Sequence, residues 1–108
     1  HTYQSGTARS GLEKKKVFLH FYADWCSYCA EMERKTFQNP AVIAMLNRNF
    51  IPIRVDSDRE KEIAALFRVK GLPDSWFLAE NGDIIAHRPG FIPAEQLLAI
   101  LNVVMGGK

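Results

Sequence analysis

The sequence Tyr22-Ala23-Asp24-Trp25-Cys26-Ser27-Tyr28-Cys29 joins an apolar run to a helical pattern and carries both cysteines of the chain. The preceding run, Val17 to Ala23, is apolar on both alternations except at His20, which is typical of a central strand covered on both faces. Cys26 therefore lies at the N-terminal end of a helix, where unpaired N–H groups and the helix dipole favour a thiolate. Cys29 lies one turn further along and is able to reach back to form a disulfide. We assign Cys26 as the nucleophile and Cys29 as the resolving thiol.

The composition indicates one compact domain and excludes several classes of protein. The chain has 108 residues, of which 47% are hydrophobic and 24% are charged, and these fractions are ordinary for a globular protein. Its 14 basic and 12 acidic residues leave a net charge of +2, which is too small and too mixed for nucleic-acid binding. No apolar run approaches the roughly 20 residues of a membrane span. We therefore expect a monomer that binds no nucleic acid and has no membrane span in this chain.

The two cysteines form neither a disulfide scaffold nor half of a zinc site. A bridge this short would constrain very little chain, and a structural zinc site needs about four ligands, usually from two spaced pairs. The three histidines, His1, His20 and His87, have no ligand-like spacing. We therefore expect no metal and no cofactor, which leaves a redox-active dithiol as the use of Cys26 and Cys29.

The remaining pattern predicts an alternation of strands and helices. We expect a flexible arm over residues 1–16, with a short helix around Leu12 to Lys15, followed by one domain over residues 17–105. Asn81-Gly82 is typical of a two-residue hairpin turn. The expected elements of the domain are strands over 17–23, 51–56, 75–78 and 84–86, and helices from 27 towards 37, after 39, around 63–67 and over 93–104.

This order predicts an α/β fold with a mixed four-stranded sheet and helices on both faces. Strands separated by helices are expected to pair in parallel, and the final hairpin adds an antiparallel edge. The cysteines then lie at the C-terminal end of the first strand, where open α/β sheets place their sites. The chain begins with His1 rather than Met, so we expect a processed product or an excised domain.

The residues around the cysteines resemble a known family. Ala23-Asp24-Trp25-Cys26-x-x-Cys29, followed later by Gly71-Leu72-Pro73, resembles thioredoxin. The segment after the cysteines is similar to the C-terminal thioredoxin-like domain of the thiol–disulfide interchange protein DsbD, and of its single-domain relatives, at Glu31, Thr36-Phe37, Pro40 and Val42. The resemblance covers the chain from Val17 to Val104. It implies a thioredoxin fold, exchange of disulfides with protein partners through a mixed disulfide, and a protein electron donor. It also implies a bacterial periplasmic or other extracytoplasmic location, while a cytoplasmic one stays open.

The resemblance also assigns a role to the segment around Pro73. Pro73 matches the cis-proline of the family, and cis bonds are nearly confined to X–Pro. In the family this loop lies beside the cysteines, and the backbone of the preceding residue, here Leu72, pairs with an extended substrate segment, which is strand addition on a small scale. The alternative is a trans proline that only ends a loop.

Two residues depart from the thioredoxin pattern. His20 stands where thioredoxin has a buried acid that helps to move the proton of the resolving cysteine. A buried imidazole should stay neutral at pH 7 and can still accept the Cys29 proton, or it is a core residue without a part in exchange. Asp74 stands where relatives usually carry Thr. Its carboxylate either faces the cysteines and disfavours their thiolates or, as we expect, faces solvent.

Two aromatic residues complete the expected partner-binding set, which is Trp25, Tyr28, Leu72, Pro73 and Asp74. Trp25 either shapes a docking surface beside the cysteines or is a plain core aromatic. Tyr28 either contacts partners and screens the nucleophile or is simply exposed.

The leading interpretation is a protein thiol–disulfide oxidoreductase that works as a reductant or an electron relay. The alternatives are a dithiol oxidase or isomerase, and a non-catalytic binding module with the same fold. The residues between the cysteines, Ser27 and Tyr28, are neither the Gly-Pro usual in thioredoxin nor the Pro-His of the strong oxidant DsbA. The motif therefore leaves the direction of exchange open.

Overall fold

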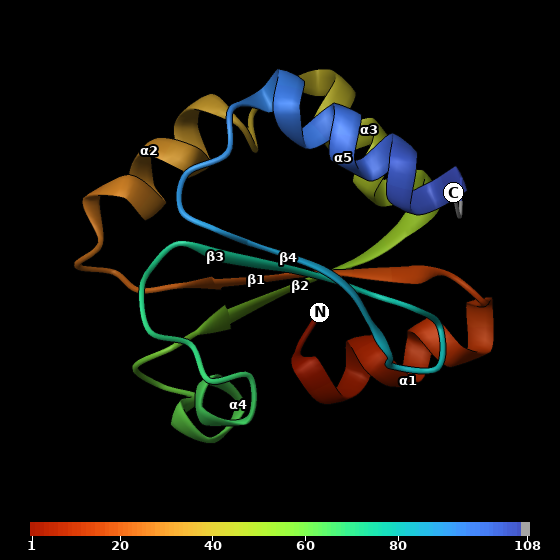
Figure 1. Ribbon diagram of the computed structural model, residues 1–108, viewed down its shortest axis with the longest axis horizontal. Helices are drawn as coiled ribbons and strands as arrows, with labels where there is room; N and C mark the ends of the chain where they lie inside the picture. The colour runs from red at the N-terminus through yellow and green to blue at the C-terminus, as the bar shows by residue number, and fades with distance from the viewer. Residues whose placement is uncertain (107–108) are drawn as a thin grey trace.

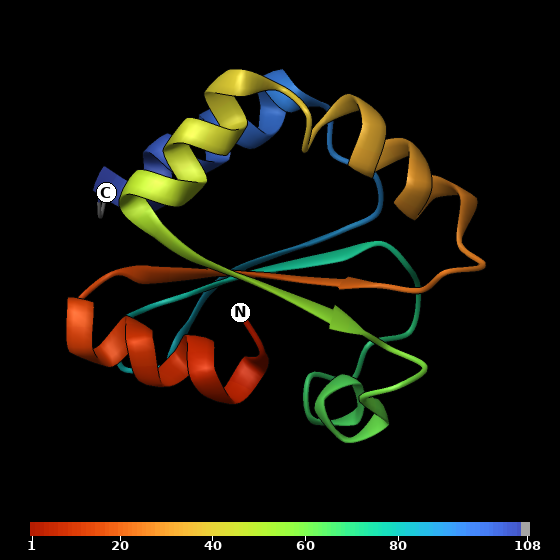
Figure 2. The ribbon, with the colours of Figure 1, turned by 180° about the vertical axis from the view of Figure 1, so that it is seen from behind.

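The computed structural model describes residues 1–106 as a central sheet between two layers of helices (Figure 1). The helices are α1 (Tyr3–Glu13), α2 (Ser27–Lys35), α3 (Pro40–Asn49), α4 (Lys61–Leu66) and α5 (Ala94–Gly106), and the strands are β1 (Lys16–Tyr22), β2 (Phe50–Asp56), β3 (Asp74–Leu78) and β4 (Ile84–Pro89). The first layer, α2, α3 and α5, covers one face of the sheet, and α1 and α4 cover the other (Figure 1, Figure 2). The predicted mixed sheet with helices on both faces is confirmed. None of the helices within residues 1–106 is long and apolar enough to cross a membrane.

The strand order is β2-β1-β3-β4, which places β1 inside the sheet. β1 pairs with β2 in parallel, with His20 opposite Arg54, and with β3 in antiparallel, with His20 opposite Ser75. The expectation of parallel pairing between strands separated by a helix is therefore right for β2 and wrong for β3. The reason is where α4 packs: residues such as Ile63 and Phe67 contact the core at the end of the sheet where β2 stops, so β3 starts at that end and runs back (Figure 1).

The alternation of β1 divides the core between the two faces of the sheet. Phe18 and His20 point towards α2, whereas Val17, Leu19 and Phe21 point towards α1 and α4. The core on the side of α2, α3 and α5 is made of Phe18, Met32, Val42, Leu46, Phe50, Phe77, Ile92, Leu97, Leu101 and Val104. The core on the side of α1 and α4 is made of Val17, Leu19, Phe21, Ile51, Ile53, Val55 and Leu78.

The β3–β4 hairpin has a longer turn than Asn81-Gly82 predicted. Ala79 N donates to Asp83 O at 2.7 Å, and Gly82 N donates to Ala79 O at 2.9 Å, so residues 80–82 form the loop. Gly82 has a φ of 93°, where a side chain would be strained. The sequence signal located the turn correctly but missed its length by one residue.

β4 is an edge strand and is largely exposed. Its pairing with β3 passes from Phe77–Ala86 to Leu78–Ile84, so Ile85 is an extra residue and forms a β-bulge. Both Ile84 and Ile85 are exposed.

The N-terminal segment is a helix, so the expected flexible arm over residues 1–16 is wrong. The Thr2 side chain accepts from Ser5 N at 3.0 Å, and the Ser5 side chain accepts from Thr2 N at 3.1 Å, which closes a capping box at the start of α1. The side of α1 that faces the sheet is made of small residues such as Gly6, and a Cβ on Gly6 would lie 2.5 Å from the Ile53 side chain. Apolar periodicity does not detect a helix that packs through small residues.

Gly6→Ala should destabilise the protein, although alanine favours a helix over glycine by about 1 kcal/mol. The added methyl group forces the fully buried Ile53 to move, and overpacking of this kind costs about 1–3 kcal/mol. Gly11 is the matched control, because nothing lies within 4 Å of a Cβ placed there, and Gly11→Ala should raise the free energy of unfolding. Urea denaturation measures both variants. A Gly6→Ala protein as stable as Gly11→Ala would contradict close packing of α1 on β2.

Candidate active site

The two cysteines are free thiols at the start of α2. Cys26 is the N-cap residue, with extended backbone, and its Sγ accepts a hydrogen bond from Cys29 N at 3.1 Å. The Cys26 carbonyl accepts from Ala30 N, which begins the helical ladder. A backbone N–H directed at an N-cap acceptor stabilises negative charge there. The geometry therefore fits the role of nucleophile predicted for Cys26.

Cys29 is buried, as Cys26 is, and it is a thiol at neutral pH. Its residue surface is 5% exposed. Burial raises the pKa of Cys29 to about 12, and its hydrogen bond to Cys26 acts in the same direction. Because the thiolate is the form that attacks a disulfide, Cys29 must lose its proton before it can act as a resolving thiol.

His20 is buried on β1 beneath α2. Its Nδ1 lies 3.3 Å from Ser75 Oγ, and its ring packs edge-on against Phe37 with 4.8 Å between centroids. Burial lowers the pKa of His20 to about 3, and the positive charge of Arg54 adds to the shift. The expectation that His20 is buried is confirmed, and the lowered pKa favours a neutral ring at pH 7.

His20 and Cys29 both line a hollow of about 160 Å³. This volume has room for several water molecules, and the wall offers polar partners for them. Arg54 and Glu33 also line the hollow and form an ion pair at 3.3 Å. The Arg54 guanidinium lies over the Tyr22 ring, 4.4 Å from its centroid. Buried and solvated polar groups therefore meet in one small space beside Cys29.

Glu33 and Arg54 are the site residues that the sequence analysis did not identify. Glu33 follows Cys29 by four positions on α2, so helical spacing places both on one face, and that signal was available in the sequence. Arg54 reaches the site through the pairing of β2 with β1, which puts it opposite His20. No local pattern reveals a contact that depends on strand pairing.

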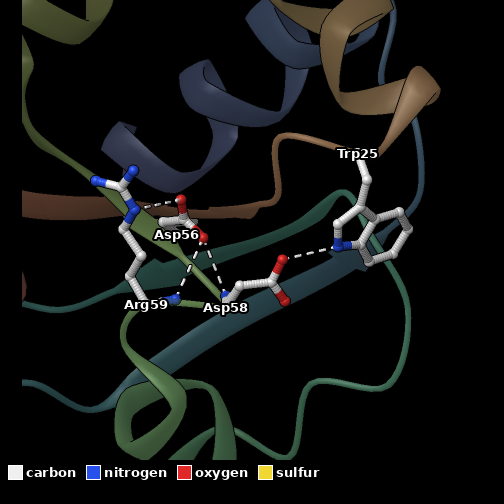
Figure 3. A network of polar contacts seen from close by, with 4 residues as sticks. All are labelled: Trp25, Asp56, Asp58 and Arg59. Atoms are coloured by element: carbon white, nitrogen blue, oxygen red, sulfur yellow. Dashed lines mark hydrogen bonds and ion pairs between the residues drawn. The ribbon is translucent and has the colours of Figure 1, made fainter.

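Trp25 is 71% exposed, so the alternative of a core aromatic is wrong. Its indole Nε1 donates to Asp58 Oδ2 at 2.8 Å (Figure 3). Asp56, at the end of β2, holds the turn that presents Asp58: its Oδ1 accepts from Asp58 N at 3.0 Å and from Arg59 N at 3.4 Å (Figure 3). The exposed indole is therefore fixed by a hydrogen bond rather than by packing.

The Leu72–Pro73 peptide bond is cis, as the resemblance implied, and the Leu72 side chain packs against the cysteines. A groove of about 370 Å³ lies between Leu72, Trp25 and α4. Tyr28 is 63% exposed and does not line this groove. The structure thus brings Trp25 and Leu72 together beside the cysteines and leaves Tyr28 exposed on α2.

Asp74 is buried at 3% exposure, so the expectation that it faces solvent is wrong. Trp76 Nε1 donates to Asp74 Oδ2 at 3.1 Å, and His87 Nε2 lies 2.6 Å from Asp74 Oδ1. Trp76 packs with the core on the side of α1 and α4, so the Asp74 carboxyl group points to the sheet face opposite α2. The donors come from β3 and β4, and strand register, which the sequence does not show, decides that they meet Asp74.

No group of three or more His, Cys, Asp or Glu side chains within residues 1–106 is placed to hold a metal ion. The reactive and polar side chains around the hollow are thiol, imidazole, carboxyl, phenol and guanidinium groups.

The chain has relatives among known proteins. The family described as a thioredoxin-like domain matches residues 3–104. The chain is 40% identical over 91 residues to the thiol:disulfide interchange protein DsbD of Vibrio vulnificus, covering 79% of this chain and 15% of that protein. It is 30% identical over 88 residues to a thioredoxin of Mycoplasmoides gallisepticum, covering 82% of this chain and 83% of that protein. The solution structure of a thioredoxin from Thermus thermophilus matches with a TM-score of 0.86 and 25% identity, covering 96% of this chain and 84% of that chain.

The buried neutral His20 should make the protein lose stability in acid. Unfolded, its ring binds a proton near pH 6.5, whereas the folded protein resists protonation down to about pH 3. Between about pH 3 and pH 6.5 the unfolded state therefore holds more protons than the folded state. Above pH 6.5 the ring is neutral in both states, so His20 costs the folded protein no stability there. As pH falls through this window, the free energy of unfolding should decrease by about 1.4 kcal/mol per pH unit.

Denaturant titrations at several pH values measure this slope. His20→Asn has no titrating ring, so its slope should be smaller by that amount. Equal slopes in the two proteins would show that His20 titrates in the folded protein as it does in the unfolded chain.

Proposed function

The chain belongs to the thioredoxin-like domain family, and from that premise we propose that it exchanges its Cys26–Cys29 dithiol with disulfides of protein partners. The observation that carries the proposal is a pair of unlike thiols. Both thiols are buried and line the same hollow, but Cys26 Sγ accepts a backbone N–H at the helix end, whereas burial and the hydrogen bond to Cys26 keep Cys29 protonated. Such a pair is suited to two attacks in a fixed order, which is the requirement for reducing a disulfide.

In the first step, the Cys26 thiolate attacks one sulfur of a partner disulfide. A bond forms between Cys26 Sγ and that sulfur, the partner's S–S bond breaks, and the second partner sulfur leaves as a thiolate that takes a proton from water. The hydrogen bond from Cys29 N supports the negative charge on Cys26 before the attack.

In the second step, Cys29 loses its proton and attacks Cys26 Sγ. The Cys26–Cys29 disulfide forms, the mixed disulfide breaks, and the partner sulfur leaves as a thiolate. The partner has then gained the two electrons that the dithiol has lost. Burial raises the pKa of Cys29 to about 12 in the free dithiol, so the thiol form dominates at pH 7. Removal of the Cys29 proton is therefore the step that needs help.

For that step we assign His20 as a proton acceptor that works through water in the hollow. Both side chains line the same cavity, and the ring is neutral. With a pKa of about 3, His20 is a weak base while Cys29 is still a thiol. A thiolate forming nearby favours the imidazolium, so the ring needs to hold the proton only during the attack. The alternative is that His20 is a core residue and the proton leaves by another route.

Partner docking is assigned to the surface around the cysteines. Trp25 and Tyr28 are exposed there, and aromatic side chains are common anchors of protein interfaces. The backbone of Leu72 is available to pair with an extended partner segment, as in strand addition, and Pro73 sets the shape of that loop. The groove beside Leu72 and Trp25 is placed to take a partner side chain next to the reacting disulfide.

The direction of exchange that we propose is reduction of the partner or electron relay, with a protein dithiol as electron donor. A strong oxidant owes its potential to a stabilised reduced form, and the hydrogen bond described for Cys26 Sγ is a single backbone N–H. A reduction potential nearer to about −270 mV than to about −120 mV supports this direction, and the reverse favours a dithiol oxidase or isomerase. A non-catalytic binding module would leave partner disulfides intact.

A monomer in a bacterial extracytoplasmic compartment is part of the same proposal. The chain spans only 15% of the length of the DsbD relative that it matches, so the activity of that whole protein is not transferred to it.

Cys29→Ser should trap partners, because Cys26 still attacks but nothing resolves the mixed disulfide. Incubation with a disulfide-containing protein such as insulin, followed by non-reducing electrophoresis, should show a covalent adduct. Cys26→Ser is the matched control and should trap nothing. Equal trapping by both variants would remove the assigned roles, and a wild-type protein that leaves insulin intact would remove the function.

His20→Ala should slow resolution of the mixed disulfide by about 10²-fold, the low end for loss of a general base, while the first attack stays nearly normal. Stopped-flow fluorescence of Trp25 separates the two steps. His20→Asp restores a proton acceptor and should recover much of the lost rate. If neither step changes in His20→Ala, His20 has only a packing role.

A further inference from the structure

Asp74, Trp76 and His87 form a polar cluster that the sulfur chemistry does not use. Asp74 Oδ2 accepts a hydrogen bond from Trp76 Nε1 at 3.1 Å, and Asp74 Oδ1 lies 2.6 Å from His87 Nε2. The Trp76 and His87 rings stack, with centroids 3.8 Å apart and 12° between their planes. Each of the three side chains therefore holds the other two in place.

The cluster fixes one end of the cis-proline loop, residues 71–73. Asp74 directly follows Pro73 and opens β3. A second contact holds the loop. Gly90, one residue beyond β4, donates a hydrogen bond from its backbone N to Pro73 O at 2.8 Å. The loop is thus attached to the end of β4 by one backbone contact and by the side-chain cluster next to it.

Burial makes Asp74 depend on its two donors. At 3% exposure its carboxyl group has little access to water, and a buried polar group that loses a hydrogen-bond partner is costly. Trp76 is held from its other side by Phe67, whose ring lies edge-on at 5.1 Å. The His87 side chain is 39% exposed on the edge strand. His87 is therefore the member whose replacement disturbs the core least.

Asp74 has no direct route to the thiols. Its carboxyl group lies on the sheet face opposite α2 and does not line the hollow beside the cysteines. The loop that it anchors does reach them, because Leu72 packs against the cysteine cluster. An effect of Asp74 on disulfide exchange must therefore pass through the position of this loop.

We propose that the Asp74–Trp76–His87 cluster positions the cis-proline loop for the backbone of a protein partner. The cluster sets the affinity for partners that present an extended segment and takes no part in the sulfur chemistry. The inference rests on the proposed function, in which the partner pairs with the Leu72 backbone. Asp74 and His87 are thus positioning residues that act through the loop.

Three variants separate this role from a general effect on stability. His87→Ala removes both the donor and the stacked ring. His87→Gln keeps an N–H donor near the position of Nε2, so it should rescue the function. Arg88→Ala is the control on the adjacent position of β4, which lies opposite Ser75 on the other face of the sheet.

The first measurement follows the loop itself by amide hydrogen exchange at Gly90, whose N–H donates to Pro73 O. His87→Ala should speed exchange at Gly90 by about tenfold or more, with unchanged exchange in the middle of β1, and His87→Gln should restore slow exchange. Unchanged exchange at Gly90 in His87→Ala would overturn the proposal, whatever the activity of the protein.

The second measurement compares insulin with cystamine, a small disulfide without a peptide backbone. His87→Ala should raise the KM for insulin reduction by about tenfold, which is about 1.4 kcal/mol, and leave kcat and the cystamine rate within about twofold. Either an unchanged KM for insulin or an equal loss of rate with cystamine in His87→Ala would overturn the proposal. The same holds if Arg88→Ala is as impaired as His87→Ala, or if His87→Gln does not restore the KM. If the wild-type protein does not reduce insulin at all, the proposed function fails, and hydrogen exchange still decides the positioning role.

Discussion

The burial of Cys29 and His20 between α2 and the sheet is the physical constraint on which the rest of the site depends. Both groups are neutral there, because burial disfavours the thiolate of one and the imidazolium of the other. The neutral imidazole of His20 tolerates its contacts with the Phe18 and Phe37 rings, whereas an isolated charge would not. The two cysteines nevertheless differ, since Cys26 Sγ accepts a backbone N–H at the start of α2, whereas Cys29 is kept as a thiol.

Polar contacts outside the cysteine pair hold the surface that a partner meets. The Trp25 indole is fixed by Asp58 from the turn after β2, and the cis-proline loop is fixed by Asp74 at the start of β3. Both carboxyl groups lie at the end of the sheet where β1 delivers the cysteines. One end of the sheet thus positions Cys26, the Trp25 indole and the cis-proline loop, and α2 on one face and α4 on the other complete this end (Figure 1).

Local sequence signals were reliable where a residue acts within its own element and failed where contacts come from strand pairing. The apolar run of β1 and the place of the hairpin turn follow from neighbouring residues. So does the start of α3, where the Asn39 side chain accepts from Ala41 N and Val42 N. The direction of β3, the burial of Asp74 and the approach of Arg54 to His20 depend on register, which no short window contains. The sequence analysis missed α1 for a different reason. A small residue such as Gly6 lets the helix approach β2 closely, so the helix needs no apolar stripe to pack there.

The bulge at Ile85 has a consequence for how two molecules behave when they collide. β4 offers an unpaired backbone edge beside the exposed Ile84 and Ile85. If such an edge were flat and regular, it would be a template for aggregation. The extra residue twists the strand locally, and Pro89 lacks an N–H at its far end. The β4 strand of a second molecule would therefore find no long run of matching donors and acceptors. The irregular edge thus disfavours edge-to-edge pairing of sheets when the protein is concentrated.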